Sequence, residues 1–258
     1  MNSEIVRHLS PEEKELARKR QELAILQAEL TDRELVLANL RAELAAFEGH
    51  YLREVGVLYA ELDDWKAKIA ELAAEADGSE GAKSAAAEAR GQAEESYAAA
   101  HGEAAKAADF SPSPELKKLF REAVKEIHPD IATDELDRAV RNHLMAEANL
   151  AYGRGDANAL RRILEEYKNS PESVKGKDVG ADLVRVLRQI DRIVKRLAQI
   201  EAEAAELASS EIALLMAKVE TATARGGNML AEMKLDVKRR IDLARIEFED
   251  QSSKMRPQ

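Results

Sequence analysis

The sequence predicts an all-α protein, folded as a long antiparallel coiled-coil hairpin with a small helical domain at its tip. Hydrophobic residues recur every seven positions in both outer thirds of the chain, and two short amphipathic helices lie near its middle. Aromatic residues make up only 4% of the 258 residues, whereas charged residues make up 34%. This composition is poor material for one large globular core and favours elongated helical structure.

The first arm of the predicted hairpin covers residues 1–77 and carries a strict heptad repeat. The repeat consists of Leu16, Leu23, Leu30, Leu37, Leu44, Tyr51, Leu58, Trp65 and Leu72. Such a repeat, sustained over many turns, imposes a left-handed coiled coil. The companion apolar position changes along the arm, because Leu26, Leu40 and Phe47 lie three residues after the repeat, whereas Val55, Leu62 and Ile69 lie four after it. We therefore expect the seam to shift between Gly49 and Gly56.

The second arm covers residues 181–258. Its stripe advances in steps of four and three through Leu183, Leu187, Ile190, Val194 and Leu197. Residues 208–210 interrupt this stripe, and helical sequence then continues from 211 to about 250, with a kink or local unwinding predicted at 226–227. Two linkers complete the arrangement: residues 78–112, rich in Ala, Glu and Gly and partly helical, and residues 169–180.

The two arms match in length, and their interruptions lie at similar distances from the linkers. An antiparallel hairpin would therefore place Gly49 beside Ser209. The alternative is a parallel homodimer through each arm, because heptads alone fix neither the number of strands nor their orientation.

The middle of the chain predicts a helix, a tight loop and a second helix. Residues 114–127 form one amphipathic helix with Ser113 as its N-cap, and Pro129 disfavours helical geometry at His128. The second helix is expected to open at Thr133 and to continue to Tyr152. The basic residues of the first helix lie largely off its apolar stripe; they are Lys117, Lys118, Arg121 and Lys125.

This unit resembles the J-domain, the module through which Hsp40-type cochaperones act on Hsp70 chaperones. LKKLFREAVKEIHPD, at 116–130, is similar to the basic second helix of that family and its HPD loop, and EANLAY, at 147–152, is similar to the N-x-A-Y signature of its third helix. The resemblance covers residues 113–168. No tyrosine-rich first helix precedes it, and Glu126 stands where a lysine is common, so Ala-rich sequence at 92–108 is expected to supply the missing helix.

The resemblance implies a cochaperone. The basic helix would dock on an acidic surface of Hsp70, while His128, Pro129 and Asp130 in an exposed loop would stimulate ATP hydrolysis. The coiled coil would then deliver a client, which the sequence does not identify. Two alternatives remain: the basic residues form an ordinary solvated helix face, or the chain is a coiled-coil scaffold whose J-like unit serves only for docking.

Other functions are disfavoured by composition. A formal charge of −10 argues against nucleic acid as the main partner, and the absence of cysteine excludes disulfides and thiol catalysis. The five histidines lack metal-ligand spacing, and no nucleophile or phosphate-binding loop accompanies His128. We therefore expect no metal, no cofactor and no catalytic activity. With no long apolar segment and no signal-peptide pattern, we also expect no membrane span and a cytoplasmic location.

Overall fold

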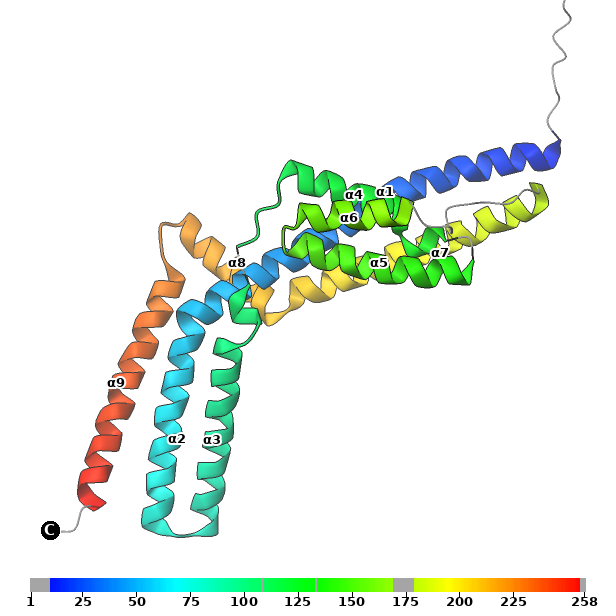
Figure 1. Cartoon of the computed structure of the whole chain (residues 1–258). Coiled ribbons are helices and arrows are strands. Elements are labelled where there is room, and N and C mark those ends of the chain that lie inside the picture. Colours follow the sequence, from blue (N-terminus) through cyan, green and yellow to red (C-terminus); the bar gives the residue numbers. More distant parts are fainter. Residues whose placement is uncertain (1–9, 108, 133, 169–178, 256–258) are drawn as a thin grey trace, which may run out of the picture. The chain divides into compact units, whose positions relative to one another are not determined.

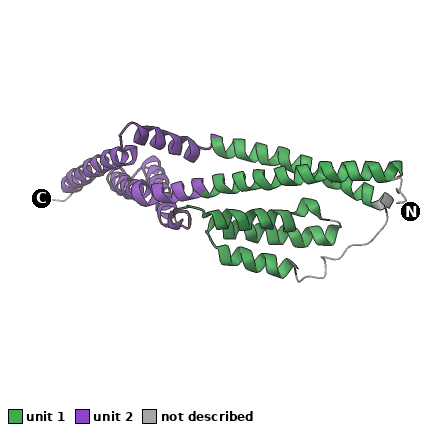
Figure 2. Ribbon diagram, turned by 90° about the horizontal axis from the view of Figure 1, so that it is seen from above, with its two compact units in different colours: residues 1–42, 110–208 green, residues 43–109, 209–258 purple. Residues whose placement is uncertain are grey.

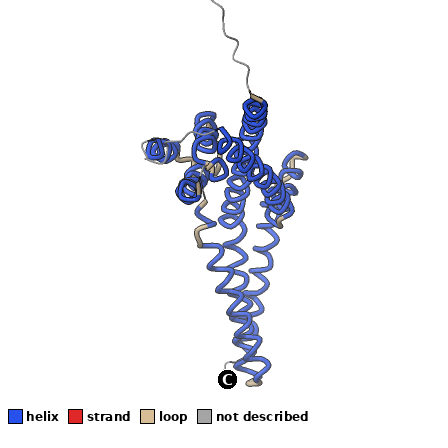
Figure 3. The backbone as a smooth tube through the Cα atoms, turned by 90° about the vertical axis from the view of Figure 1, so that its right-hand side faces the viewer, coloured by secondary structure: helices blue, strands red, loops and turns tan. Residues whose placement is uncertain are grey.

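The structure is a computed structural model that describes residues 10–107, 109–132, 134–168 and 179–255. Every regular element in these ranges is a helix or a helical turn (Figures 1 and 3). The all-α prediction is therefore confirmed. None of the helices in the described ranges has the length and hydropathy needed to cross a bilayer.

The chain forms two compact units, each assembled from segments that are distant in sequence (Figure 2). Unit 1 contains residues 1–42 and 110–208, and unit 2 contains residues 43–109 and 209–258. Helix α1 (Pro11–Tyr51) contributes its first part to unit 1 and its last turns to unit 2.

In unit 1, α1 packs against α7 (Val179–Ser209) through the heptad predicted for the first arm, whereas the stripe predicted for the second arm is wrong at Leu187 and Val194, which are exposed. The buried seam consists of Leu16, Leu23, Leu30 and Leu37 from α1 with Val186, Ile193 and Ile200 from α7. Both sets advance in steps of seven, as expected for two helices that keep the same faces in contact over several turns.

The two helices run parallel, so the predicted antiparallel pairing is wrong. Arg20 pairs with Asp182, Glu34 with Arg196, and Arg41 with Glu203. Residue numbers rise together along both helices, which happens only when two helices point the same way. Heptads are compatible with either direction.

The helical domain lies along α1 and not at a hairpin tip. It comprises α4 (Pro114–Ile127), α5 (Glu135–Gly153) and α6 (Ala157–Lys168), with a 3-10 turn at Pro129–Ile131 between α4 and α5. Its core includes Leu35 and Ala38 from the middle of α1, together with Phe120, Tyr152 and Leu160. The helix that completes the domain therefore comes from α1, not from residues 92–108.

Unit 2 contains the region, Gly49 to Gly56, where the seam of the first arm was expected to shift. A π-helical turn at Leu52–Gly56 separates α1 from α2 (Val57–Asp77). A π-turn places one extra residue in the helix, and this accounts for the change from a three-residue to a four-residue companion spacing. Ser209 was predicted to lie beside Gly49, but the residues nearest to Gly49 are Ala104 and Ala107. A Cβ at Gly49 would lie 2.8 Å from the Ala104 carbonyl oxygen.

Helix α3 (Glu80–His101) occupies most of the segment expected to be a linker. Gly78, at a φ of 68°, ends α2, and the Ser79 hydroxyl caps α3 by accepting from the Ala82 amide. Helix α3 returns antiparallel to α2, because Arg90 pairs with Glu71 while Ser96 bonds Asp63. Its buried residues are Ala86, Ala93 and Ala100. A linker was expected because this segment has few large apolar residues. Small residues spaced by seven nevertheless allow α3 to pack closely against α2.

The rest of unit 2 comes from the C-terminal part of the chain. Helix α8 (Glu211–Ala224) ends before Gly226, whose φ is 81°, and α9 (Met229–Met255) follows. The glycine pair therefore separates two helices, where a kink or local unwinding was predicted. Helix α9 packs beside α2, with Trp65 and Phe248 in edge-to-face contact at 5.6 Å between ring centroids.

The parallel pairing of α1 and α7 can be tested by cross-linking, since the chain has no native cysteine. Arg20→Cys with Asp182→Cys should give an intrachain link with a short bismaleimide. Arg20→Cys with Glu203→Cys should not, because Glu203 lies 21 residues farther along α7, about 32 Å at 1.5 Å per residue. Denaturing electrophoresis and peptide mapping separate intrachain from interchain links. Failure of the first pair, or links only between chains, would contradict the assignment.

The alanine face of α3 gives a second test. Ala86→Leu should lower the free energy of unfolding by about 1 to 3 kcal/mol, because added methylene groups have no room in a close helix contact. Ala87→Leu is the matched control, since Ala87 is exposed on the same helix. Chemical denaturation followed by Trp65 fluorescence would measure both variants. Equal stability of the two would show that α3 does not pack on α2 through alanine.

Candidate functional site

The candidate site is the loop between α4 and α5, where the predicted residues His128, Pro129 and Asp130 lie. Ser113 caps α4 by accepting from the Leu116 amide at 3.1 Å. The helix ends at Ile127, and His128 has the extended backbone (φ −64°, ψ 132°) that a following proline favours. Local sequence therefore fixes the path of the loop as predicted.

The loop is buried, although an exposed loop was expected. His128 is 2% exposed and Asp130 is 8% exposed. The Asp130 backbone N–H donates to His128 Nδ1 at 3.2 Å, which leaves the hydrogen on Nε2, and Nε2 lies 3.0 Å from Glu34 Oε1. One neutral tautomer therefore satisfies both ring nitrogens. Glu34 lies on α1, 94 residues away in sequence, so local sequence could not reveal this contact.

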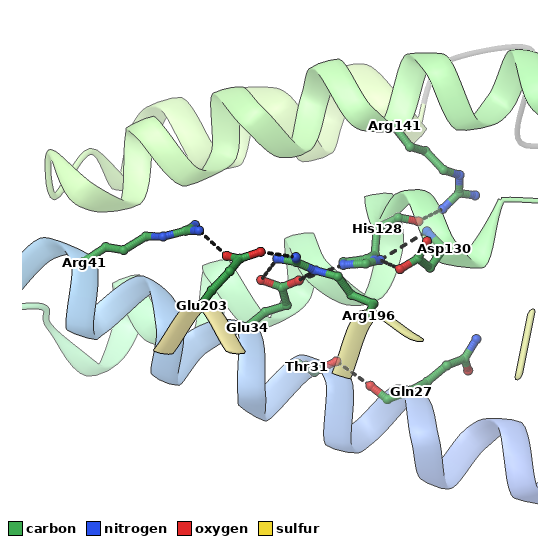
Figure 4. A network of polar contacts seen from close by, with 9 residues as sticks. All are labelled: Gln27, Thr31, Glu34, Arg41, His128, Asp130, Arg141, Arg196 and Glu203. Atoms are coloured by element: carbon green, nitrogen blue, oxygen red, sulfur yellow. Dashed lines mark hydrogen bonds and ion pairs between the residues drawn. The ribbon is translucent and has the colours of Figure 1, made fainter. Parts of the chain in front are cut away.

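Glu34 also accepts from α7, and Figure 4 shows the resulting network. Arg196 donates through Nε to Glu34 Oε1 at 2.7 Å and through Nη1 to Glu203 Oε1 at 2.7 Å. Arg41 continues the chain of charges to Glu203. A single carboxylate therefore joins α1, the loop and α7.

The network shifts the pKa of its central members. Burial alone would raise the pKa of Glu34, but the hydrogen bonds from His128 and Arg196 outweigh it and lower that pKa below its usual value. Burial would likewise lower the pKa of Arg196, but Glu34 and Glu203 raise it. Both groups therefore stay charged. Their mutual attraction and hydrogen bonds can then offset the free-energy cost of removing the two charges from water.

Helix α7 holds the loop by two further hydrogen bonds. Gln189 Nε2 donates to the Ile131 carbonyl at 2.8 Å, and Arg192 Nη2 donates to the Ala132 carbonyl at 3.2 Å. With Arg196, these residues lie at i, i+3 and i+7, which places them on one face of the helix. A polar cavity of about 330 Å³ remains beside the loop, lined in part by Asp130 and Arg196.

Helix α5 supports the loop from its other side. Asp134 caps α5 by accepting from the Asp137 amide at 2.9 Å; the predicted cap, Thr133, lies outside the described residues. Asp137 accepts from Arg141 Nε at 2.7 Å, and Arg141 Nη1 donates to the Glu126 carbonyl at 2.8 Å. Arg141 therefore ties the end of α4 to α5 and fixes the position of the loop.

The four basic residues of α4 lie near the loop but not in it. Lys118, Arg121 and Lys125 are exposed and Lys117 is half-buried. Arg121 Nε lies 3.3 Å from Asp32 on α1. Within the described part of the chain, no ion pair involves the other three, so their charge is available to a partner.

In the N-x-A-Y segment, the alanine and the tyrosine pack in the core of the domain. Tyr152 is fully buried and donates its hydroxyl to Asn39 Oδ1 on α1 at 2.7 Å. Ala151 is buried beside it, whereas Asn149 is half-buried at the cavity.

The sequence interpretation missed Glu34 and Arg196, although a signal was present. An apolar residue lies three positions after Leu23 and after Leu37. The corresponding position after Leu30 is Arg33, and Glu34 follows it. In α7, polar residues recur three positions after each core residue, at Gln189, Arg196 and Glu203. Polar residues that repeat beside a hydrophobic seam indicate a partner at that face.

No family model, no curated protein and no solved structure matches this chain. In the described ranges, no cluster of three potential ligands could hold a metal ion. The role of the loop therefore has to be inferred from its own residues and their contacts.

The buried carboxylate predicts a specific loss of stability. Glu34→Ala should lower the free energy of unfolding by about 1 to 3 kcal/mol, because it leaves buried donors on His128 and Arg196 without their acceptor. Glu29→Ala is the control, since Glu29 is exposed on α1 and lies 3.8 Å from Arg33. Denaturant unfolding would compare the two, and similar losses would contradict a central role for Glu34.

The same carboxylate predicts a pH dependence. Because folding lowers the pKa of Glu34 from 4.5, its ionised form favours the folded state at pH values above 4.5. That contribution is lost as the pH falls through the lower folded pKa. The difference in stability between the parent and Glu34→Gln should therefore be constant above about pH 5 and shrink in more acid solution. A difference that grows on acidification would exclude the ionised form.

Proposed function

We propose that this chain is a J-domain cochaperone that stimulates the ATPase of an Hsp70 chaperone. The observation that supports this most directly is the combination of a basic helix and an adjoining HPD loop. Lys118 and Lys125 are exposed on α4, and α4 leads directly into His128. These are the residue types, in the order along the chain, that the resemblance to the family requires.

Docking would begin with the charges of α4. Exposed lysines attract an acidic surface, which raises the association rate and orients the encounter more than it adds to final affinity. Screening within about 8 Å at physiological ionic strength should weaken this attraction as salt increases. The HPD loop would then act at the partner once its side chains become accessible.

The paired helices would provide the second function, the selection of a client. Helix α7 exposes Val184, Leu187 and Val194, which lie outside its buried seam. Apolar residues on one side of a helix fit the apolar face of another helix. We assign client binding to this class of interaction.

A second candidate is a coiled-coil scaffold in which the J-like unit is only a docking module. The burial of His128 and its bond to Glu34 favour this alternative, because such a side chain already has a structural role. The two candidates differ in whether Hsp70 turnover depends on the loop.

A single-turnover ATPase assay with purified Hsp70 separates them. The chain should accelerate hydrolysis, and Asp130→Asn should remove most of that acceleration while preserving the shape of the side chain. Lys125→Glu should raise the concentration needed for half-maximal stimulation, more at low salt than at high salt. Lys218→Glu is the control, because Lys218 is an exposed lysine on α8.

Thermal unfolding of each variant would show whether the fold is retained. Stimulation that survives Asp130→Asn, or Lys218→Glu and Lys125→Glu variants with equal effects, would remove the cochaperone assignment. Complete absence of stimulation at all concentrations, by the parent and by variants with an accessible loop, would favour the scaffold.

A further inference from the structure

We propose that α7 is a removable cover that regulates the HPD loop. In the closed arrangement α7 occupies the loop, and release of α7 from α1 makes the loop accessible to Hsp70. This inference rests on the proposed function and adds its regulation.

The cover is made by one face of α7. Gln189 and Arg192 bond the carbonyl oxygens of Ile131 and Ala132, directly after the HPD residues. Arg196 holds Glu34, which in turn holds His128 (Figure 4). The same turns of α7 therefore bond the loop directly and also fix Glu34, the carboxylate that bonds His128. Another protein cannot reach that side of the loop while α7 is in place.

Helix α7 is not part of the core that folds the domain. The core of α4, α5 and α6 is completed by Leu35 and Ala38 of α1, and within the described residues no buried member of that cluster comes from α7. The seam of α7 with α1 is a separate cluster, formed from Val186, Ile193 and Ile200 on the α7 side. Release of α7 would break that seam while the apolar core of the domain stayed intact.

The supports that come from within the domain and from α1 remain without α7. Arg141 of α5 bonds the Glu126 carbonyl, and Asp130 donates its backbone N–H to His128 within the loop. Tyr152 still bonds Asn39 of α1. An opened chain would therefore present a loop that is already shaped, and opening would change access without refolding.

The consequence for activity follows from a two-state equilibrium. When only a fraction of the chains is open, the apparent dissociation constant for Hsp70 is the intrinsic one divided by that fraction. A change that favours the open state by about tenfold, or about 1.4 kcal/mol, lowers the concentration needed for half-maximal stimulation by about the same factor, as long as most chains are closed.

The opening variant combines three substitutions on the loop-facing side of α7. They are Gln189→Ala, Arg192→Ala and Arg196→Ala. The matched control combines three on its exposed face, where Lys195 pairs with Asp191 of the same helix. They are Arg188→Ala, Asp191→Ala and Lys195→Ala. Each full-length protein is examined by hydrogen exchange of residues 126–132 and by single-turnover Hsp70 ATPase.

We expect the opening variant to exchange faster in the loop and to stimulate at about tenfold lower concentration, with the control close to the parent. A locked chain provides the opposite test. Arg20→Cys with Asp182→Cys, joined by a reducible bismaleimide, should lose stimulation when linked and recover it after reduction. This result does not depend on whether the triple variant folds.

The outcomes separate the two proposals. If loop exchange and stimulation are unchanged in the opening variant and in the locked chain, while the parent stimulates through Asp130, the cover is refuted and the cochaperone assignment stands. If exchange rises on opening and falls on locking but Hsp70 turnover never responds, the cover is supported as a structural device and the cochaperone assignment is refuted.

Discussion

The structure of unit 1 depends on one buried carboxylate. Glu34 is 3% exposed, and it accepts from His128 of the loop and from Arg196 of α7. A buried charge is costly unless its partners compensate for the lost water, so α1, the loop and α7 must be in place together. Removing either partner changes the surroundings of the other through Glu34. This shared acceptor makes the state of α7 relevant to the chemistry of His128.

The helical nature of the chain and the seam of α1 could be predicted from sequence, but the buried face of α7 and the direction of pairing could not. Leu16 to Leu37 and Val186 to Ile200 define faces that two helices can bury in either orientation. The residues that reveal the direction are the ion pairs beside the seam, such as Arg20 with Asp182. Alanine contacts also escaped prediction, because Ala86 and Ala93 lack the size that marks a core residue.

The place of the candidate site in the sequence was predicted, but its environment was not. Pro129 and the caps Ser113 and Asp134 act over a few residues, so local sequence determines the loop path. Burial of His128 depends instead on α1 and α7, which lie far from it in sequence. A polar residue next to a loop motif gives no local sign of whether another helix covers it.

Stability and the proposed partner binding make opposing demands on His128. The contact with Glu34 satisfies the Nε2 hydrogen and contributes to folding, yet a side chain that is 2% exposed cannot meet a partner at the same time. A rigid arrangement would preserve the contact between His128 and Glu34 but would keep a partner from reaching His128. An arrangement in which α7 contributes bonds to the loop but no residue to the domain core can satisfy both in turn. The division of unit 1 into a domain core and a separate α1–α7 seam is therefore the feature that makes reversible access physically reasonable.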